Sequence, residues 1–293
     1  MFFLVLSILV ATLFGISFKV LAVKNINSFQ AIIINYIVAG SLGFLTTKSG
    51  LTPFNVIHES FMPFAFALGI VFILSLIAIA KTTAKYGISV AQVANRMSLV
   101  IPISIAIMFY GDAITFLKVI GFILALTAVY LVSHKESSEK TNEKLWWLLP
   151  LMVFVLAGIL DSSLNYAQRF LVNDLNIDAF LSAIFSSAFI VGSIVLAYQL
   201  TIKKEKFLWS SVPAGVIVGL INYGVMYFFM KALNSHALEP SVLFPINNLS
   251  ILILSTIISV LVFKEKLSVK NWIGIGLSLL AIFILSGLIG ILF

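Results

Sequence analysis

Two charged residues, Arg96 and Asp161, lie deep inside apolar stretches of this 293-residue sequence. A charge within an apolar, membrane-length stretch costs roughly 3 kcal/mol even on lenient insertion scales, so each is a candidate for function by default. The planar guanidinium of Arg96 can bind a carboxylate or another anion through two parallel hydrogen bonds. The carboxylate of Asp161 can bind an ammonium group or carry a proton. The alternative is a structural ion pair between the two residues.

Amide and phenol side chains accompany the two charges. Asn95 precedes Arg96, and Asn165 lies one helical turn after Asp161. Further polar residues occupy two later apolar stretches: Asn222, Tyr223, Asn247 and Asn248. Such groups either line a polar cavity or form hydrogen bonds between helices, each worth ~0.6 kcal/mol. Their concentration in four stretches favours a shared cavity that binds a substrate.

Other kinds of chemistry have little support in the sequence. There is no Cys, and His58, His134 and His236 are far apart, which argues against a metal site. No two acidic residues share an apolar stretch, as a membrane-embedded enzyme would need. No GxxxxGK[ST] loop is present to bind ATP. We therefore expect no cofactor, no bound metal and no enzymatic activity.

The elements that position these residues follow from composition. Hydrophobic residues make up 61% of the chain and charged residues 10%, with a mean hydropathy of +1.15. Soluble domains are about 45–50% apolar and about 25% charged, so the sequence predicts an integral membrane protein. Runs of about 20 apolar residues are typical of membrane-spanning helices, not of barrel strands. Ten such runs fall near residues 3–23, 28–47, 61–84, 88–110, 115–133, 145–168, 178–201, 211–233, 240–263 and 270–292.

Small and cyclic residues add local detail to these runs. Pro102 lies inside the fourth run, where it can kink the helix. Gly215 and Gly219 form a small-xxx-small pair, which allows another helix to pack closely. Lys81 and Lys231 lie near the ends of the third and eighth runs, where they are candidate gates or simply extend toward the membrane surface.

The chain also divides into two similar halves. The polar segment 135–144 separates residues 1–134 from residues 145–293. Several residues recur after a shift of about 150 positions: Pro63 as Pro213, Gly69 as Gly219, Lys81 as Lys231, and Asn95-Arg96-Met97-Ser98 as Asn247-Asn248-Leu249-Ser250. Since each half carries five predicted helices, the second enters the membrane from the opposite side. The sequence thus predicts an all-α protein of ten transmembrane helices, arranged as two inverted five-helix repeats.

This arrangement resembles the drug/metabolite transporter superfamily, in particular its ten-span EamA-type members. In that family the fourth and ninth spans lead through a short acidic turn into a Gly-containing fifth and tenth span. The matching stretches here are Gly111-Asp112-Ala113-Ile114-Thr115 through Gly121, and Lys264-Glu265-Lys266-Leu267-Ser268 through Gly274. The resemblance implies transport of amino acids, other metabolites, nucleotide sugars or drugs. It also implies a central cavity lined by the first, third, fourth, sixth, eighth and ninth spans.

Taken together, these features predict a secondary transporter, independent of ATP, for small polar or zwitterionic metabolites, with amino-acid export as one candidate activity. It would work by alternating access, with Asp161 as the candidate site of a coupling proton. Export of hydrophobic cations or lipid-like compounds on the same fold is the alternative, and a channel or a membrane-embedded enzyme is less favoured. The expected partners are a small-molecule substrate, the lipid bilayer and a proton, without nucleic acid. Monomer and homodimer both stay open.

The basic residues predict an orientation in the cell (inner) membrane. One side of the predicted membrane carries Lys19, Lys24, Lys81, Lys85, Lys135, Lys140, Lys144, Lys203, Lys204, Lys206, Lys264, Lys266 and Lys270, and the other carries Lys48, Lys118, Arg169 and Lys231. Short basic loops stay in the cytoplasm, which places the Lys-rich side there and both termini outside. Members of the resembling family commonly have both termini inside, so the two arguments disagree.

Overall fold

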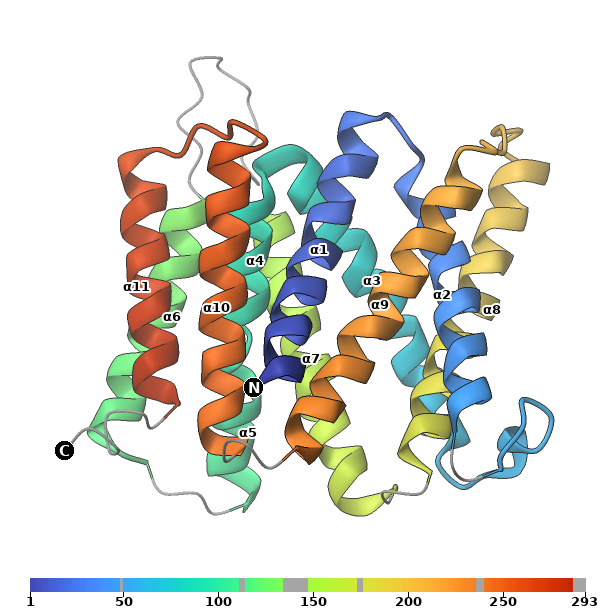
Figure 1. The fold of residues 1–293 in the computed structure, drawn as a ribbon, viewed down its shortest axis with the longest axis horizontal. Coiled ribbons are helices and arrows are strands. Elements are labelled where there is room, and N and C mark those ends of the chain that lie inside the picture. Colours follow the sequence, from blue (N-terminus) through green and yellow to red (C-terminus); the bar gives the residue numbers. More distant parts are fainter. Residues whose placement is uncertain (48–49, 111–113, 134–146, 173–175, 236–239, 287–293) are drawn as a thin grey trace. The chain divides into compact units, whose positions relative to one another are not determined.

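The computed structural model describes residues 1–47, 50–110, 114–133, 147–172, 176–235 and 240–286. Within these ranges the regular structure is helical (Figure 1). The elements are α1 (Phe2–Val23), α2 (Ser28–Thr46), η1 (Val56–His58), α3 (Met62–Tyr86), α4 (Ile88–Met97), α5 (Val100–Tyr110), α6 (Phe116–Ser133), α7 (Leu148–Phe170), α8 (Ile177–Thr201), α9 (Ser211–Asn234), α10 (Pro240–Leu261) and α11 (Val269–Leu285). The predicted linker 135–144 and the acidic turn 111–113 lie outside the described residues.

Among the residues that the structure describes, eight helical segments are long and apolar enough to cross a membrane: Phe2–Val23, Ser28–Thr46, Met62–Tyr86, Ile88–Phe109, Phe116–Ser133, Leu148–Ala167, Ile177–Thr201 and Ser211–Ala232. Two further apolar helices, Ile246–Leu261 and Val269–Leu285, are shorter over the described residues. Large apolar side chains such as Leu13, Ile123 and Ile217 are exposed along these helices, as lipid contact requires. The chain is therefore an all-α, multi-pass membrane protein.

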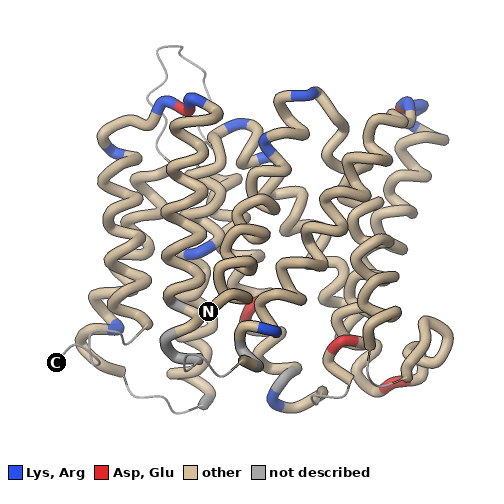
Figure 2. Tube along the Cα trace, viewed as in Figure 1, with Lys and Arg blue, Asp and Glu red and all other residues tan. Residues whose placement is uncertain are grey.

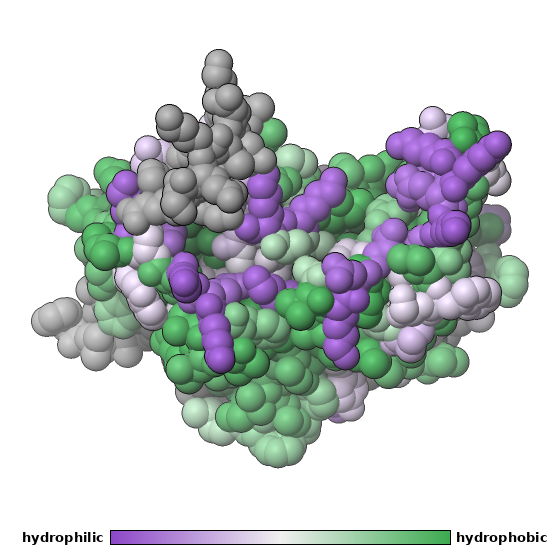
Figure 3. Space-filling model, turned by 90° about the horizontal axis from the view of Figure 1, so that it is seen from above, coloured by the Kyte–Doolittle hydropathy of each residue, from purple (hydrophilic) through white to green (hydrophobic). Residues whose placement is uncertain are grey.

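Charged residues are concentrated at the ends of the helices (Figure 2). Lys264 and Lys266 lie between α10 and α11, and Lys203 and Lys204 follow the end of α8. Figure 3 shows hydrophilic residues gathered in patches on the face in view, with hydrophobic residues between them. This distribution is the one expected where helices emerge from a bilayer into water.

The chain forms two compact units, and each contains segments from both halves of the sequence. The first unit consists of Met1–Lys19, Ala78–Gly158 and Val225–Phe293, and the second of Val20–Ile77 and Ile159–Gly224. Helices α1, α3, α7 and α9 each contribute residues to both units. These compact units therefore do not coincide with the predicted halves 1–134 and 145–293, and the internal repeat stays a prediction.

In the first unit, α6 packs along α11, and α4 packs against α6, α10 and α11. The core between them includes Val93, Met97, Ala128, Leu252 and Ile282, all buried. A cap begins α11: the Ser268 hydroxyl accepts a hydrogen bond from the backbone N–H of Asn271. The Asn271 amide also donates to the backbone oxygen of Val132 at 2.7 Å, which ties α11 to α6.

Close packing of α11 on α6 depends on Gly274. A Cβ atom there would lie 2.9 Å from the backbone nitrogen of Val132 and 3.0 Å from the backbone oxygen of Ala128. We expect Gly274→Ala to destabilise the protein by about 1–3 kcal/mol, because backbone atoms cannot move aside cheaply.

The matched control on the same helix is Gly276→Ala, since a Cβ at Gly276 meets no atom within 4 Å. Alanine also favours helix over glycine, so this control should keep or raise the midpoint of thermal unfolding. Thermal unfolding in detergent compares the two variants. Equal midpoints would contradict the packing argument.

In the second unit, α2 packs along α8, and the first part of α9 lies against α2. A Cβ at Gly215 would lie 2.7 Å from the backbone oxygen of Ala31, and one at Gly219 would lie 2.9 Å from that of Asn35. The structure thus confirms that this glycine pair allows close helix packing. Elsewhere in the unit, Phe61 and Phe180 pack edge to face with ring centroids 5.4 Å apart.

Candidate functional site

The fourth apolar run contains a break between α4 and α5, and this break confirms the kink expected from Pro102. Proline has no N–H, and its ring clashes with the carbonyl four residues earlier, which belongs to Ser98. The backbone N–H of Ile101 instead donates to the Ser98 carbonyl at 2.9 Å, a tighter turn. The Ser98 hydroxyl donates to the backbone oxygen of Asn95 at 2.6 Å. The break therefore places a helix C terminus inside an apolar run.

Arg96 lies in the last turn of α4, beside this break, and its side chain is partly buried. A helix C terminus carries partial negative charge, which stabilises a cation there. The Arg96 Nη1 donates to Oδ1 of Asn248 on α10 at 2.9 Å. The neighbouring Asn247 is 7% exposed, and its Oδ1 accepts from the Ser7 hydroxyl of α1 at 3.3 Å. The first unit thus brings Arg96 together with the two predicted amides of the ninth run.

Two further polar residues share the face of α4 that carries Arg96. Ser89 and Gln92 precede Arg96 by seven and four residues, spacings that place all three on one side of a helix. We call this set, Ser89, Gln92 and Arg96, the polar face of α4. Ser89 is 0% exposed and Gln92 is 6% exposed. Neither residue was expected from the sequence, although their spacing from Arg96 was a usable signal.

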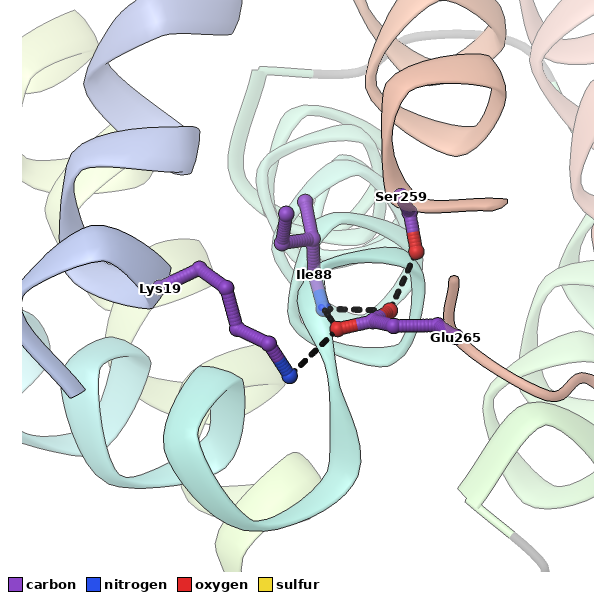
Figure 4. Close-up of polar contacts among 4 residues, drawn as sticks. All are labelled: Lys19, Ile88, Ser259 and Glu265. Atoms are coloured by element: carbon purple, nitrogen blue, oxygen red, sulfur yellow. Dashed lines mark hydrogen bonds and ion pairs between the residues drawn. The ribbon is translucent and has the colours of Figure 1, made fainter. Parts of the chain in front are cut away.

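A second polar cluster lies at the other end of α4, centred on Glu265 (Figure 4). The Lys19 Nζ lies 2.6 Å from Glu265 Oε1, and these side chains are only 17% and 10% exposed. The backbone N–H of Ile88 points at the carboxylate, 3.1 Å from each oxygen. The Ser259 hydroxyl donates to Glu265 Oε2. We call these four residues the Glu265 cluster.

Local backbone geometry explains why a carboxylate fits there. Ile88 is the first residue of α4, and helix N termini offer unsatisfied N–H groups and partial positive charge to an anion. Gly87 precedes it with φ of +101°, a conformation that favours glycine. A Cβ at Gly87 would lie 2.7 Å from the carboxyl carbon of Glu265. The Glu265 cluster therefore fastens the end of α1, the start of α4 and the end of α10 to one another.

The remaining predicted polar residues belong to the second unit. Asp161 and Asn165 lie on α7 with exposed side chains, and Asn165 Oδ1 accepts from Nε of Arg169 at 2.9 Å. The Asn222 amide donates to Oδ1 of Asn35 at 3.0 Å. The Tyr223 hydroxyl lies 2.6 Å from Oγ1 of Thr46. Asn222 and Tyr223 therefore connect α9 to α2, which is the interhelical role considered as the alternative to lining a cavity. A pairing of Asp161 with Arg96, which belongs to the first unit, stays a prediction.

The two candidate gate residues are both exposed. Lys81 lies on α3 and Lys231 in the last turn of α9. The Lys231 Nζ lies 5.7 Å from the ring centroid of Tyr227, within range of a cation–π contact. A gating role for either lysine stays a prediction.

A metal site needs several His, Cys, Asp or Glu side chains close together. Among the described residues, no group of three or more of these side chains is arranged to hold a metal ion. A groove of about 570 Å³ lies in the second unit between α2 and the segment after it, lined by Ile37, Ser41, Phe44, Leu45, Thr47, Gly50, Leu51, Thr52, Pro53 and Ser186. This mainly apolar lining suits hydrocarbon better than a charged ligand.

Comparison with known proteins identifies the family. The sequence profile described as the EamA-like transporter family matches residues 148–287. An uncharacterized protein of Haemophilus influenzae is 30% identical over 287 residues, which is 96% of each chain. The chain belongs to the EamA-like transporter family. Membership confirms the resemblance to the drug/metabolite transporter superfamily.

The fold of this EamA-like transporter is also similar to that of solved structures. One such crystal structure is of a protein with 17% sequence identity to this chain. The alignment covers 98% of this chain and 97% of that protein's chain, with a TM-score of 0.59. At that identity the likeness concerns the fold alone. As an EamA-like transporter, the chain acts on a small-molecule substrate and is embedded in a lipid bilayer. Members of the family are transporters and not enzymes.

Proposed function

We propose that this EamA-like transporter carries small zwitterionic metabolites, with neutral amino acids as the substrates to test first, and that it works without ATP. The position of Arg96 carries the proposal. This guanidinium lies at a helix end inside the apolar run and donates to the amide oxygen of Asn248. Two further neutral amides lie near it on α4: Asn95 is the preceding residue, and Gln92 lies one helical turn earlier. A guanidinium can bind a carboxylate through two parallel hydrogen bonds, and amides can donate to or accept from the rest of a small polar molecule.

We also propose alternating access between two inverted five-helix repeats of a ten-helix chain. Three helix pairs support this arrangement, because each joins an element of the first half to its counterpart in the second: α2 with α8, α4 with α10, and α6 with α11. The family profile matches 148–287, which falls within the proposed second repeat 145–293. A helix broken within the membrane beside a charged residue is a common feature of substrate sites in such transporters.

The proposed orientation in a cell (inner) membrane has the Lys-rich ends in the cytoplasm and both termini outside. It is supported by the lysines that follow α8 and those between α10 and α11. Cytoplasmic loops of membrane proteins carry an excess of lysine and arginine. In this orientation Lys81 lies at the cytoplasmic mouth of the pathway and Lys231 at the opposite mouth, where each acts as a gate.

Asp161 is the proposed site of the coupling proton, because an ionisable carboxyl group within an apolar span is costly and commonly belongs to a proton or ion pathway. We expect Asp161→Asn to abolish the stimulation of amino-acid uptake by a proton gradient, while exchange across the membrane continues. Asparagine keeps the shape of the side chain but cannot carry a proton. Uptake of labelled L-alanine, L-leucine and L-phenylalanine into proteoliposomes, with and without an imposed pH difference, measures this.

The matched control is Asp178→Asn, which removes a carboxylate from the first turn of α8. Gradient-stimulated uptake should persist in this control. If the Asp161→Asn variant keeps the full stimulation by the proton gradient, Asp161 is not the coupling site.

A further inference from the structure

Gln92 has unused hydrogen-bonding capacity one helical turn from Arg96. Its side chain is 6% exposed, and within the described residues its Oε1 has no hydrogen-bond partner. The hydroxyl of Ser89, on the same polar face of α4, is likewise buried and unpartnered among those residues. Buried polar atoms in proteins nearly always have partners, so each exception needs a reason. In a transporter, such an atom can be left without a protein partner because it binds a polar group of the substrate.

The position of the Gln92 amide is held by α1. The Nε2 end of Gln92 occupies the space that a Cβ would fill at Gly15. Side chains four residues apart on a helix begin about 5–6 Å from each other, so Gln92 and Arg96 reach toward neighbouring points. A small molecule bound by its carboxylate to Arg96 would therefore bring an adjacent group close to Gln92.

The chemical type of the residue matters as much as its place. A carboxylate at position 92 would form an ion pair with Arg96 and compete with an anionic substrate. The neutral Oε1 of an amide accepts a hydrogen bond from an N–H group without neutralising Arg96. A site with a buried acceptor discriminates against an analogue that lacks the matching donor, because the acceptor is then left unpaired.

We propose that Gln92 determines specificity by accepting a hydrogen bond from an ammonium group next to the carboxylate that Arg96 binds. The transporter would then select amino acids over the corresponding deaminated carboxylates. This inference rests on the proposed function, and it assigns the ammonium group to a residue of the same unit as Arg96.

The test compares paired probes on purified protein. Each pair consists of a neutral amino acid and its deaminated counterpart: L-alanine and propanoate, L-leucine and 4-methylpentanoate, L-phenylalanine and 3-phenylpropanoate. Affinities are measured by isothermal titration for the wild type and for Gln92→Leu, which removes the acceptor and keeps an apolar side chain of similar size. We expect the wild type to bind the amino acid of its best pair at least 10-fold more tightly. In Gln92→Leu that affinity should fall at least 10-fold, while the affinity for the carboxylate stays the same.

A second variant displaces the amide without changing it. Gly15→Ala places a methyl group where the amide lies, so it should lower the affinity for the amino acid selectively, whereas Gly276→Ala should change neither affinity. If Gln92→Leu does not fold, Gln92→Met and Gly15→Ala carry the test.

The outcomes separate the two claims. Equal losses for both members of a pair, or unchanged selectivity, in Gln92→Leu and Gly15→Ala would overturn the role of Gln92 and leave the proposed function standing. Failure of the wild type to bind either member of any pair would overturn the proposed function, and this inference with it.

Discussion

Arg96→Ala is expected to weaken the binding of neutral amino acids by about 100-fold, or ~2.7 kcal/mol. The variant loses a charge-assisted, two-point contact with the substrate carboxylate, which is among the strongest hydrogen-bonding arrangements in proteins. The affinity for amines that lack a carboxylate should change little in this variant, because Arg96 does not attract them. Isothermal titration of the wild type and of Arg96→Ala measures these affinities. The ligands are L-alanine, L-leucine and L-phenylalanine, each with the matching amine.

Two further variants test whether the loss comes from the missing contact with the substrate carboxylate. Arg96→Lys keeps the charge and a donor for Asn248 but loses the planar pair of donors, so its affinity should fall between those of the wild type and Arg96→Ala. Arg169→Ala removes an exposed arginine that contacts Asn165 on α7 and should leave affinity unchanged. Equal losses for amino acids and amines in Arg96→Ala would show that Arg96 has only a structural role.

Glu265→Ala is expected to lower the free energy of unfolding by about 3 kcal/mol, the low end of the range for removing one partner of a buried ion pair. The low end applies because Lys19 and Glu265 keep 17% and 10% exposure. The variant leaves the Lys19 ammonium and the Ile88 N–H without their acceptor. Thermal and denaturant unfolding in detergent measure the loss.

A graded series makes the argument specific. Glu265→Gln keeps an acceptor for the Ile88 N–H, so its free energy of unfolding should fall less than that of Glu265→Ala. Lys19→Met leaves the carboxylate bound by Ile88 and Ser259, so its loss should also be smaller. Combining Glu265→Gln with Lys19→Met should cost less than the sum of the two, because both changes break the same ion pair. Lys266→Met, at an exposed lysine of the same connection, is the control. Additive losses, or losses no larger than in Lys266→Met, would contradict a coupled cluster.

The helices could be predicted because a bilayer imposes a simple rule: a spanning segment must satisfy its own backbone and present apolar side chains. The run predicted at 178–201 is the helix Ile177–Thr201, and the run at 211–233 is Ser211–Asn234. The break beside Arg96 could also be predicted from the sequence, because the effect of Pro102 on the helix is local. Local sequence was enough wherever the cause of a structure lies within one helix.

The contacts between distant segments were only partly predictable. Arg96 and Asn248 occupy equivalent places in the two predicted repeats, so the repeat indicated that they are related, and the structure joins them at 2.9 Å. Lys19 and Glu265 carried no such signal, because nothing near either residue specifies which helix ends meet. They were interpreted as an orientation marker and part of an acidic turn. Asn222 donates a hydrogen bond to Asn35. This contact could not be predicted, because the apolar run around Asn35 gives no indication of its partner.

Solute counterflow in proteoliposomes measures the proposed transport of amino acids itself. Vesicles that contain the purified protein are loaded with unlabelled L-alanine, L-leucine or L-phenylalanine and diluted, without ATP, into a trace of the same labelled amino acid. The proposed function predicts transient accumulation of label by the wild type for at least one of these amino acids, and none by Arg96→Ala. Absence of accumulation for all three, or equal accumulation of amines that lack a carboxylate, would contradict it.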